Sequence, residues 1–269
     1  MDYKMILLGL VQGLTEFLPV SSSGHLALAQ IFLGITTPPL SYDLVLHVAT
    51  MLATVIFFLY DIISLLGGWI GGFIPSSNRH GEGWPTGWAV IVGTIITGAI
   101  GYYAKDFVET ATQNSLMVGL GLMFTGFILL VCSFLRQGYG KVRVTDGLFV
   151  GLAQGIAVLP GVSRSGMTMM AGLAVGISRE EAFRFSFLLS IPAILGATIL
   201  QAFDMGGWHG FVTSLPSGWF LGAVCAFVSG FLALAALKRI VIASKWWMFG
   251  VYCLIVGGAA VAITYLGAW

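Results

Sequence analysis

Apolar residues in this sequence form long runs that are separated by short polar segments. Six runs approach the ~20 residues that a helix needs to cross the hydrocarbon core of a bilayer. They cover residues 42–61, 87–104, 115–135, 182–203, 217–237 and 247–267. Four shorter runs have the length of half-spans, and they cover residues 3–18, 22–34, 146–159 and 165–177. The pattern predicts an all-α polytopic membrane protein with six transmembrane helices and four half-helices.

The four half-helices come in two pairs, and each pair meets at a proline that is followed by serines. Pro19 and Pro160 cannot donate to a helical hydrogen-bond ladder, whereas serine is a favourable N-cap. Each pair therefore predicts a re-entrant helix-turn-helix hairpin, which enters the membrane and leaves on the same side. Irregular backbone at that depth is tolerated only where protein or a water-filled cavity surrounds it.

The two predicted turns resemble each other in sequence. The segment "LVQGLTEFLPVSSSGH" (10–25) aligns with "LAQGIAVLPGVSRSGM" (152–167) at an offset of 142 residues, apart from a one-residue shift at the prolines. Identical pairs at this offset include Gln12–Gln154, Ser21–Ser163 and Ser23–Ser165. Each half holds one hairpin and three spans. Because the number of spans is odd, the second half starts on the opposite side of the membrane and inserts upside down relative to the first. We therefore expect one membrane domain, 1–269, built as an inverted-topology repeat of about 1–135 and about 144–269.

The composition agrees with a membrane location and excludes several classes of protein. The chain is 58% hydrophobic and 9% charged, against roughly 25% charged residues in a soluble domain. The net charge of +1 and the lack of a basic stripe exclude an electrostatic nucleic-acid binder. The three cysteines lie in apolar runs without CxxC spacing, and the four histidines show no metal-ligand spacing.

Basic residues predict the orientation, because cytoplasmic loops carry an excess of lysine and arginine. With six spans, one side of the membrane receives Arg79, Arg136, Lys141, Arg143, Arg179, Arg184, Lys238, Arg239 and Lys245. The other side receives only Lys4 and Lys105. The first side is therefore expected to be cytoplasmic. Both termini then lie outside the cell membrane, and the first hairpin opens the active site to the outer face.

Arg164 is the most informative polar residue of the second turn. An arginine deep in a membrane costs about 2.5–3.5 kcal/mol even on a lenient insertion scale. One interpretation is an arginine that snorkels to the cytoplasmic mouth of the hairpin; the other is an anion clamp, because the planar guanidinium fork suits phosphate. Ser163 and Ser165 flank it, Thr168 lies one turn later, and a helix N-terminus follows. These features predict a phosphate cradle.

Glu16 is its counterpart in the first hairpin, where a carboxylate within an apolar half-helix needs a partner. Gln12 lies at i−4 and shares its helix face. Glu16 is either exposed at a wet hairpin mouth, or it acts as a base, a metal ligand or the residue that orients a histidine.

The serine run Ser21, Ser22 and Ser23 has a structural alternative, since one serine can cap the half-helix and the others can fill a small-residue contact. Ser22 and His25 are at i and i+3, which places hydroxyl and imidazole side by side. A membrane histidine can instead be a buried hydrogen-bond donor. His47, in the first long span, is interpreted as a packing residue.

Differences between the repeats assign acid–base groups to the first turn and the cation to the second. The matched pairs that differ are Glu16–Val158, Ser22–Arg164 and His25–Met167. If the turns face each other, an anion bound by Arg164 is expected to lie against Glu16, Ser22 and His25.

At these motifs the sequence resembles the undecaprenyl-diphosphate phosphatases, the bacitracin-resistance proteins. That family carries an E/Q-x-x-x-E stretch that runs into a serine-rich turn and a histidine, and a second P-G-x-S-R-S motif followed by a threonine. Here the motifs read Gln12…Glu16, "PVSSSGH" and "PGVSRSGMT". The resemblance implies hydrolysis of undecaprenyl diphosphate to undecaprenyl phosphate and inorganic phosphate. This reaction recycles the lipid carrier for cell-wall polymers and confers bacitracin resistance.

The resemblance also implies roles for individual residues. Catalytic roles fall to Glu16, Ser22, His25 and Arg164, and substrate-binding roles to Gln12, Ser21, Ser23, Ser163, Ser165 and Thr168. It implies a divalent cation, Mg²⁺ or Ca²⁺, with Glu16 as a possible ligand, and no organic cofactor. Gln12 stands where some family members have glutamate, which removes a carboxylate and weakens the case for a tight metal site.

Two other functions fit parts of the pattern. Inverted repeats with broken helices are also typical of a transporter or lipid-phosphate flippase, and a fold alone does not separate the two. An intramembrane serine protease fits less well, because the serine and histidine lie on one half-helix. The charged cluster favours hydrolysis, with His25, Ser22 or water as the attacking group. The expected partners are the polyprenyl diphosphate, membrane lipids and, in an oligomer, further copies of the chain.

Overall fold

The six predicted membrane spans are present as long helices in the computed structural model, which describes residues 2–35, 40–74, 81–135 and 138–266. Among the described residues, six helices are long and apolar enough to cross a bilayer: α3 Leu40–Phe57, α5 Gly83–Thr112, α6 Ser115–Cys132, α9 Arg179–Asp204, α11 Trp219–Ile242 and α12 Trp247–Tyr265. Within the described residues the only β-type pairing is an isolated parallel bridge between Gly140 and Ile177. The prediction of an all-α, multi-pass membrane protein is confirmed.

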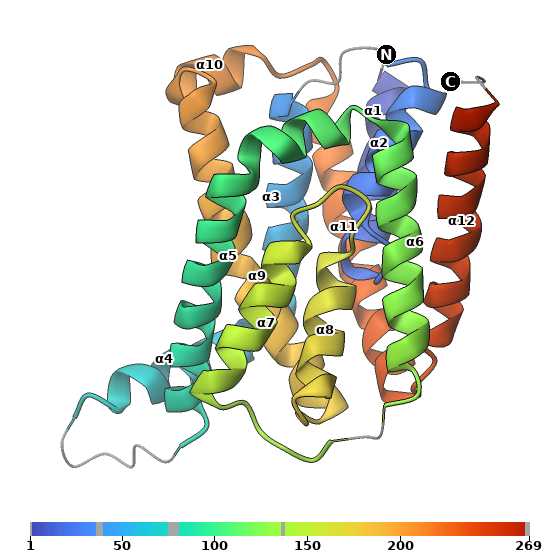
Figure 1. Ribbon diagram of the computed structural model, residues 1–269. Coiled ribbons are helices and arrows are strands. Elements are labelled where there is room, and N and C mark those ends of the chain that lie inside the picture. Colours follow the sequence, from blue (N-terminus) through green and yellow to red (C-terminus); the bar gives the residue numbers. More distant parts are fainter. Residues whose placement is uncertain (1, 36–39, 75–80, 136–137, 267–269) are drawn as a thin grey trace.

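Two pairs of shorter helices occupy the predicted hairpin positions. They are α1 Asp2–Phe17 with α2 Ser22–Phe32, and α7 Val144–Ile156 with α8 Arg164–Ala174. In Figure 1, α1 and α2 lie toward the end of the bundle that carries both termini, whereas α7 and α8 rise from the opposite end. The arrangement is consistent with two re-entrant hairpins that enter from opposite faces.

The two halves of the chain pack in an equivalent way, as an inverted repeat requires. α1 lies along α11, α7 lies along α5, and α6 lies along α12. A methyl group added at Gly9 would come within 2.2 Å of the Gly222 carbonyl oxygen, and one added at Gly151 within 2.6 Å of the Gly93 Cα. Gly9 and Gly151 are related by the repeat offset, so one small-residue helix crossing is used twice.

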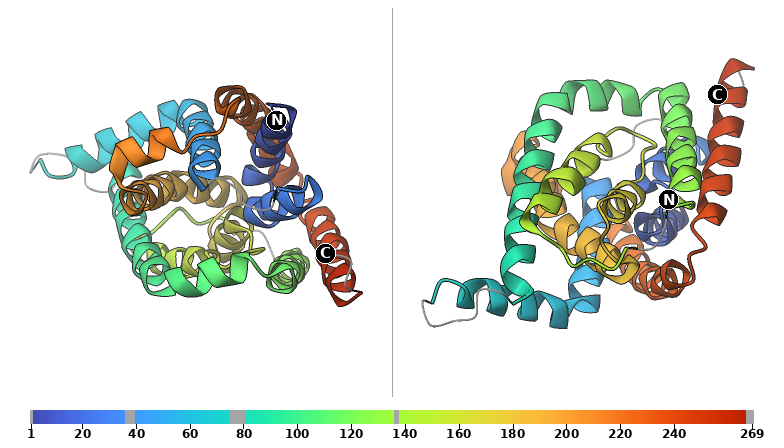
Figure 2. Two further views of the ribbon diagram at one scale, coloured as in Figure 1. Left: turned by 90° about the horizontal axis from the view of Figure 1, so that it is seen from above. Right: turned by 60° about the horizontal axis from the view of Figure 1, so that its bottom comes forward.

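The structure departs from the predicted boundaries of the first span. The apolar run 42–61 is divided at Phe58, where α3 ends and α4 Leu59–Gly71 begins. No residue of α4 is buried, and in Figures 1 and 2 the helix turns outward from the bundle. Hydropathy alone cannot show this break, because α4 is as apolar as the span that precedes it. A further short helix, α10 Gly207–Thr213, connects α9 to α11.

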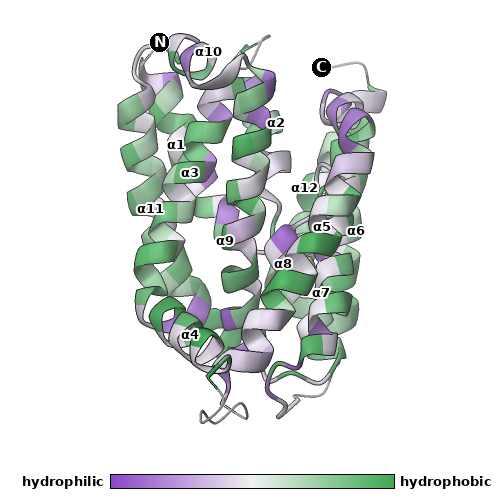
Figure 3. Cartoon of the chain, turned by 90° about the vertical axis from the view of Figure 1, so that its left-hand side faces the viewer, coloured by the Kyte–Doolittle hydropathy of each residue, from purple (hydrophilic) through white to green (hydrophobic). Residues whose placement is uncertain are grey.

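The distribution of basic residues follows the two ends of the bundle. The loop before α7, the start of α9 and the end of α11 carry most of the basic residues, and they lie at the end opposite the termini (Figure 1). Arg79 and Arg136 belong to the same predicted group but fall outside the described residues. Figure 3 shows hydrophobic positions around the middle of the bundle and a few hydrophilic ones at mid-height beside α8 and α9.

A cluster of buried phenylalanines supports the inner end of α1. The Phe17 ring meets Phe187 edge-on, with ring centroids 5.7 Å apart, and Phe58 and Phe183 complete the cluster at 5.8 and 5.0 Å from Phe187. Aromatic pairs of this kind contribute about 0.5–1.5 kcal/mol beyond the area they bury. The cluster fixes the last turn of α1, which carries Glu16.

Candidate active site

Glu16 is the centre of a polar cluster that joins the two hairpins. Its side chain is only 4% exposed, and its Oε1 accepts a hydrogen bond from Arg164 Nη2 at 2.6 Å. Its Oε2 accepts from Ser22 Oγ at 2.6 Å and from Gln12 Nε2 at 2.9 Å. The structure therefore brings together four of the predicted site residues, from segments that are 148 residues apart.

Local helix geometry explains how these side chains converge. Gln12 and Glu16 lie one turn apart on the same face of α1. Ser22 and Arg164 are the first residues of α2 and α8, and they are equivalent positions of the repeat. The first turn of each half-helix thus presents one functional side chain to Glu16, a hydroxyl from the first hairpin and a guanidinium from the second.

The serines that precede these positions are helix caps. Ser21 Oγ accepts from the Gly24 backbone N–H at 3.3 Å, and Ser163 Oγ accepts from that of Gly166 at 3.1 Å. The structural alternative for the serine run is therefore correct for Ser21, which caps α2. The Ser21 backbone has a φ of 66°, in the left-handed region that non-glycine residues seldom adopt.

The two turns touch each other at equivalent points. A Cβ added at Gly24 would lie 3.2 Å from the Gly161 Cα, and one added at Gly166 would lie 3.3 Å from the Pro19 Cβ. Ser165 Oγ also donates to the Leu18 carbonyl oxygen across the boundary at 3.3 Å. A side chain at Gly24 or Gly166 would force atoms of the opposite turn to shift slightly, and one at Gly161 would meet the Val118 carbonyl oxygen of α6 at 2.1 Å.

The other predicted substrate-binding residues hold the turns in shape. Ser23 Oγ lies 3.3 Å from Ser21 Oγ, and Ser165 Oγ lies at the same distance from Ser163 Oγ. Thr168 Oγ1 donates to the Arg164 carbonyl oxygen and lies 2.5 Å from Ser186 Oγ on α9. These contacts involve backbone and hydroxyl groups. None of them uses the Arg164 guanidinium, which binds Glu16.

His25 is bonded to groups other than Glu16 and Ser22. Its Nδ1 is 2.9 Å from the Ser21 carbonyl oxygen, and its Nε2 is 2.7 Å from Tyr252 Oη on α12. The two rings stack with centroids 5.5 Å apart. Because a carbonyl oxygen can only accept, Nδ1 carries the proton and Nε2 accepts from the tyrosine hydroxyl. The i, i+3 spacing from Ser22 fixed the helix face but not the direction of the ring.

His47 reaches the cluster although it was interpreted as a packing residue. Its Nε2 lies 3.8 Å from Glu16 Oε2, and its Nδ1 is bonded to the Asp43 carbonyl oxygen at 2.8 Å. The Asp43 carboxylate accepts from Gln30 Nε2 on α2 at 2.9 Å. The only sequence signal was a histidine inside an apolar span. Which face of α3 meets the hairpins is decided by tertiary packing.

Two buried polar atoms of the cluster have no hydrogen-bond partner within the described part of the chain, Arg164 Nη1 and Gln12 Oε1. A buried group of this kind costs about 1–3 kcal/mol when it stays unsatisfied. A donor and an acceptor left open beside Glu16 indicate that the site is completed by a ligand. An arginine donor next to a carboxylate-bound serine hydroxyl suits a phosphoryl group.

The residues do not fit a preformed divalent-metal site. Both carboxylate oxygens of Glu16 already accept hydrogen bonds from Arg164, Ser22 and Gln12. Among residues 2–35, 40–74, 81–135 and 138–266 there is no group of three His, Cys, Asp or Glu side chains that could hold a metal ion. Ca²⁺ takes six to eight oxygen ligands and Mg²⁺ requires an octahedral set, so no reaction step is assigned to a metal.

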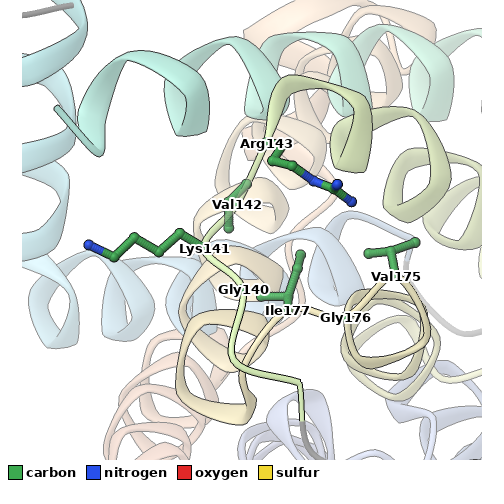
Figure 4. A pocket seen from close by; sticks show the side chains of 7 residues that line it. All are labelled: Gly140, Lys141, Val142, Arg143, Val175, Gly176 and Ile177. Atoms are coloured by element: carbon green, nitrogen blue, oxygen red, sulfur yellow. The ribbon is translucent and has the colours of Figure 1, made fainter. Parts of the chain in front are cut away.

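A pocket of about 340 Å³ lies beside the start of α7 and the end of α8, and its basic residues are already paired. Figure 4 shows Lys141 pointing away from this pocket. Lys141 bonds to Glu82, which lowers the pKa of Glu82 and raises that of Lys141. Arg143 pairs with Asp146 at 2.9 Å. The pocket therefore offers no free cation to an anionic ligand.

A second pocket, of about 290 Å³, is apolar and lies beside the turn of the second hairpin. Its lining comes from α5, α6, the end of α7 and the turn, and includes Phe107, Leu120, Phe124, Leu159 and Pro160. The end of this lining at Val162 is two residues from Arg164. An apolar surface thus reaches the segment that carries the guanidinium.

Comparison with known proteins gives a consistent result over nearly the whole chain. Residues 5–259 match the family model of the bacitracin resistance protein BacA. The undecaprenyl-diphosphatase of Desulfosudis oleivorans is 42% identical over 96% of this chain and 97% of its own length. Those of Methanosphaera stadtmanae and Syntrophotalea carbinolica are 39% and 40% identical, and each alignment covers at least 94% of both chains.

Proposed function

The chain belongs to the bacitracin resistance protein family, and from this membership we propose that it hydrolyses undecaprenyl diphosphate to undecaprenyl phosphate and inorganic phosphate. Such an enzyme recycles the lipid carrier of cell-wall polymers and confers bacitracin resistance. The observation that carries the proposal is the open Arg164 Nη1 beside a serine hydroxyl that is bonded to Glu16. A transporter of lipid phosphate is not favoured, because the relatives are named as diphosphatases.

The contacts support Ser22 as the attacking group. Ser22 Oγ donates to Glu16 Oε2, so the carboxylate is placed to take the proton as the oxygen attacks the terminal phosphorus. The P–O bond to the bridging oxygen breaks, and undecaprenyl phosphate leaves. The leaving undecaprenyl phosphate takes the proton from Glu16, which makes the carboxylate a base again. Water then attacks the phosphorus of the phosphoserine, Glu16 accepts the water proton and returns it to Ser22 Oγ, and inorganic phosphate is released.

Arg164 stabilises the charge that develops on the terminal phosphate. Its Nη2 stays on Glu16 Oε1, and its buried Nη1, which has no hydrogen-bond partner among the described residues, would donate to a phosphate oxygen. An arginine aimed at a transferring phosphoryl group contributes about 10³–10⁵ in rate, or about 4–7 kcal/mol. This exceeds the insertion cost of about 2.5–3.5 kcal/mol for an arginine in the membrane.

His25 is less suited to attack than Ser22. Both of its ring nitrogens are engaged, by the Ser21 carbonyl oxygen and by Tyr252 Oη. Attack through Nε2 would break the bond to Tyr252. We therefore assign His25 a supporting role in holding α2 against α12, where it keeps the Ser22 turn in place.

The requirement for a divalent cation stays a prediction from the family resemblance. Mg²⁺ is commonly held by one or two carboxylates together with substrate phosphates. In this chain most of its ligands would have to come from the diphosphate, because the Glu16 oxygens already accept three hydrogen bonds. Formation of an oligomer likewise stays a prediction.

A polar site among membrane helices is what this substrate demands, since its head group is charged and its polyprenyl body is apolar. The prenyl chain remains in lipid, and the apolar pocket beside Pro160 provides a surface for it next to the second turn. The substrate-binding roles of Gln12, Ser21 and Ser23 remain part of the proposal. Gln12 Oε1 only accepts hydrogen bonds, so it would contact a protonated phosphate oxygen or the attacking water.

The direct test is release of inorganic phosphate from undecaprenyl diphosphate by the purified protein in detergent, with and without a chelator. We expect release, and acid quench during turnover should trap an acid-stable phosphoserine at Ser22 that is absent from Ser22→Ala. Failure of the wild-type protein to release phosphate contradicts the proposed function. An acid-labile phosphohistidine at His25 contradicts only the choice of nucleophile.

We also propose that the hairpin carrying Glu16 and Ser22 opens to the outside of the cell, in line with the basic residues. A cysteine in place of the exposed Ser217, between α10 and α11, should react with an impermeant thiol reagent on intact cells. A cysteine in place of the exposed Tyr139, in the loop before α7, should react only after lysis. The reverse labelling pattern means that the site faces the cytoplasm.

A further inference from the structure

His47 is a polar residue of the cluster that the proposed reaction leaves unused. It comes from α3, outside both hairpins, and its Nε2 lies 3.8 Å from Glu16 Oε2. Its Nδ1 is bonded to the Asp43 carbonyl oxygen at 2.8 Å, which requires the proton on Nδ1. The helix therefore holds the ring in one orientation and directs Nε2 toward the carboxylate that the two hairpins share.

The gap between His47 Nε2 and Glu16 Oε2 is too long for a hydrogen bond. When the ring is neutral, Nε2 is an acceptor, as is the Glu16 carboxylate oxygen, so no direct hydrogen bond joins the two side chains. The His47 side chain is 30% exposed, whereas that of Glu16 is 4% exposed. His47 therefore lies at the open edge of the cluster, where a ligand would enter beside Nε2.

The charged groups around His47 do not balance the negative charge of a diphosphate ligand. The ionisable groups that face it are Glu16 from α1, Asp43 on its own helix and, beyond Glu16, Arg164 from α8. The formal charges of Glu16 and Arg164 cancel. A diphosphate carries several negative charges, so it requires a further donor at this edge.

We propose that His47 is a second phosphate-binding residue, which binds the diphosphate as the imidazolium and donates from Nε2, while Arg164 holds the diphosphate from the opposite side of Glu16. Ser22 Oγ and His47 Nε2 lie 2.6 and 3.8 Å from the same atom, Glu16 Oε2. A phosphoryl group placed for attack by Ser22 therefore has an oxygen within reach of Nε2. The identity of the substrate rests on the proposed function, whereas affinity of the site for a diphosphate can be measured without it.

The experiment measures binding of methylenediphosphonate, a diphosphate analogue that cannot be hydrolysed, to the purified full-length protein in detergent by calorimetry. His47→Ala should weaken binding about tenfold, the value of one hydrogen bond to a charged group. His47→Gln should recover most of this affinity, because its amide can donate to phosphate. Thr50→Ala is the matched control, since Thr50 lies one turn further along α3 and bonds only to carbonyl oxygens of its own helix.

The outcomes separate this inference from the hydrolysis proposal. Three outcomes would overturn the role of His47. The His47→Ala variant could bind as tightly as wild type, it could lose no more affinity than Thr50→Ala, or the wild type could fail to bind the analogue. Binding that depends on His47 in a protein that releases no phosphate counts against hydrolysis and leaves the phosphate-binding role intact. If the wild type does hydrolyse the lipid, His47→Ala should raise KM more than it lowers kcat.

Discussion

The two hairpin turns share one scaffold and differ in the side chain that each contributes. In both, a serine caps the following half-helix, and its hydroxyl lies 3.3 Å from that of the serine two residues later. In both, a neighbouring long helix donates to the turn. Cys253 of α12 lies 3.7 Å from the Pro19 carbonyl oxygen, and Thr125 of α6 lies 3.1 Å from that of Gly161.

The difference lies in the first residue of each half-helix, Ser22 in one turn and Arg164 in the other. A duplicated scaffold thus places two unlike groups on the same carboxylate, Glu16, which has no acidic counterpart in the second repeat. The comparison shows that function here arises from divergence at a few positions, while the caps and close backbone approaches that shape the turns are kept.

The largest expected effect comes from the cation of the second turn. Arg164→Ala should lower the rate of phosphate release by about 10³–10⁵, and it leaves the buried Glu16 carboxylate without its charged partner. Arg164→Lys should fail nearly as badly, because lysine keeps the charge but lacks the fork that serves Glu16 and phosphate together. Full turnover of the lysine variant at saturating lipid would reduce Arg164 to a general positive charge.

The next effect concerns the carboxylate of the first hairpin. Glu16→Gln keeps the shape of the side chain and an acceptor for Arg164, but it cannot take the proton from Ser22. Turnover should fall by about 10²–10⁴, the usual contribution of general-base catalysis. Size-exclusion chromatography in detergent serves as the folding control. Near-full turnover of this variant at neutral pH would make Glu16 a structural residue.

The smallest expected effect concerns the backbone conformation at the capping serine of each turn. Glycine tolerates the Ser21 φ of 66° without strain, whereas Ser163 has an ordinary φ of −79°. Ser21→Gly should therefore leave thermal stability in detergent unchanged or slightly higher, while Ser163→Gly loses a few tenths of a kcal/mol with its cap. A larger loss in Ser21→Gly than in Ser163→Gly would show that the left-handed serine is held by more than its capping bond.

The sequence by itself determined the six spans and their order, but not the break at Phe58 or the short helix α10. Prolines followed by serines predicted the two helix-turn-helix pairs, because these signals depend on local backbone chemistry, and their re-entrant insertion stays a prediction. The internal repeat predicted that two unlike turns meet, and charge requirements in a membrane predicted that Arg164 and Glu16 need partners. Each is the other's partner in the structure, at 2.6 Å.

Only the tertiary structure decided which faces of the helices meet and where the side chains point. His25 shares a helix face with Ser22, but its ring turns to Tyr252, which is 227 residues away in the sequence. His47 is one histidine in an apolar span, and it reaches Glu16 because the packing of α3 turns that face toward the hairpins. Helical periodicity is local, whereas helix rotation and side-chain rotamers are set by contacts between segments far apart in the chain.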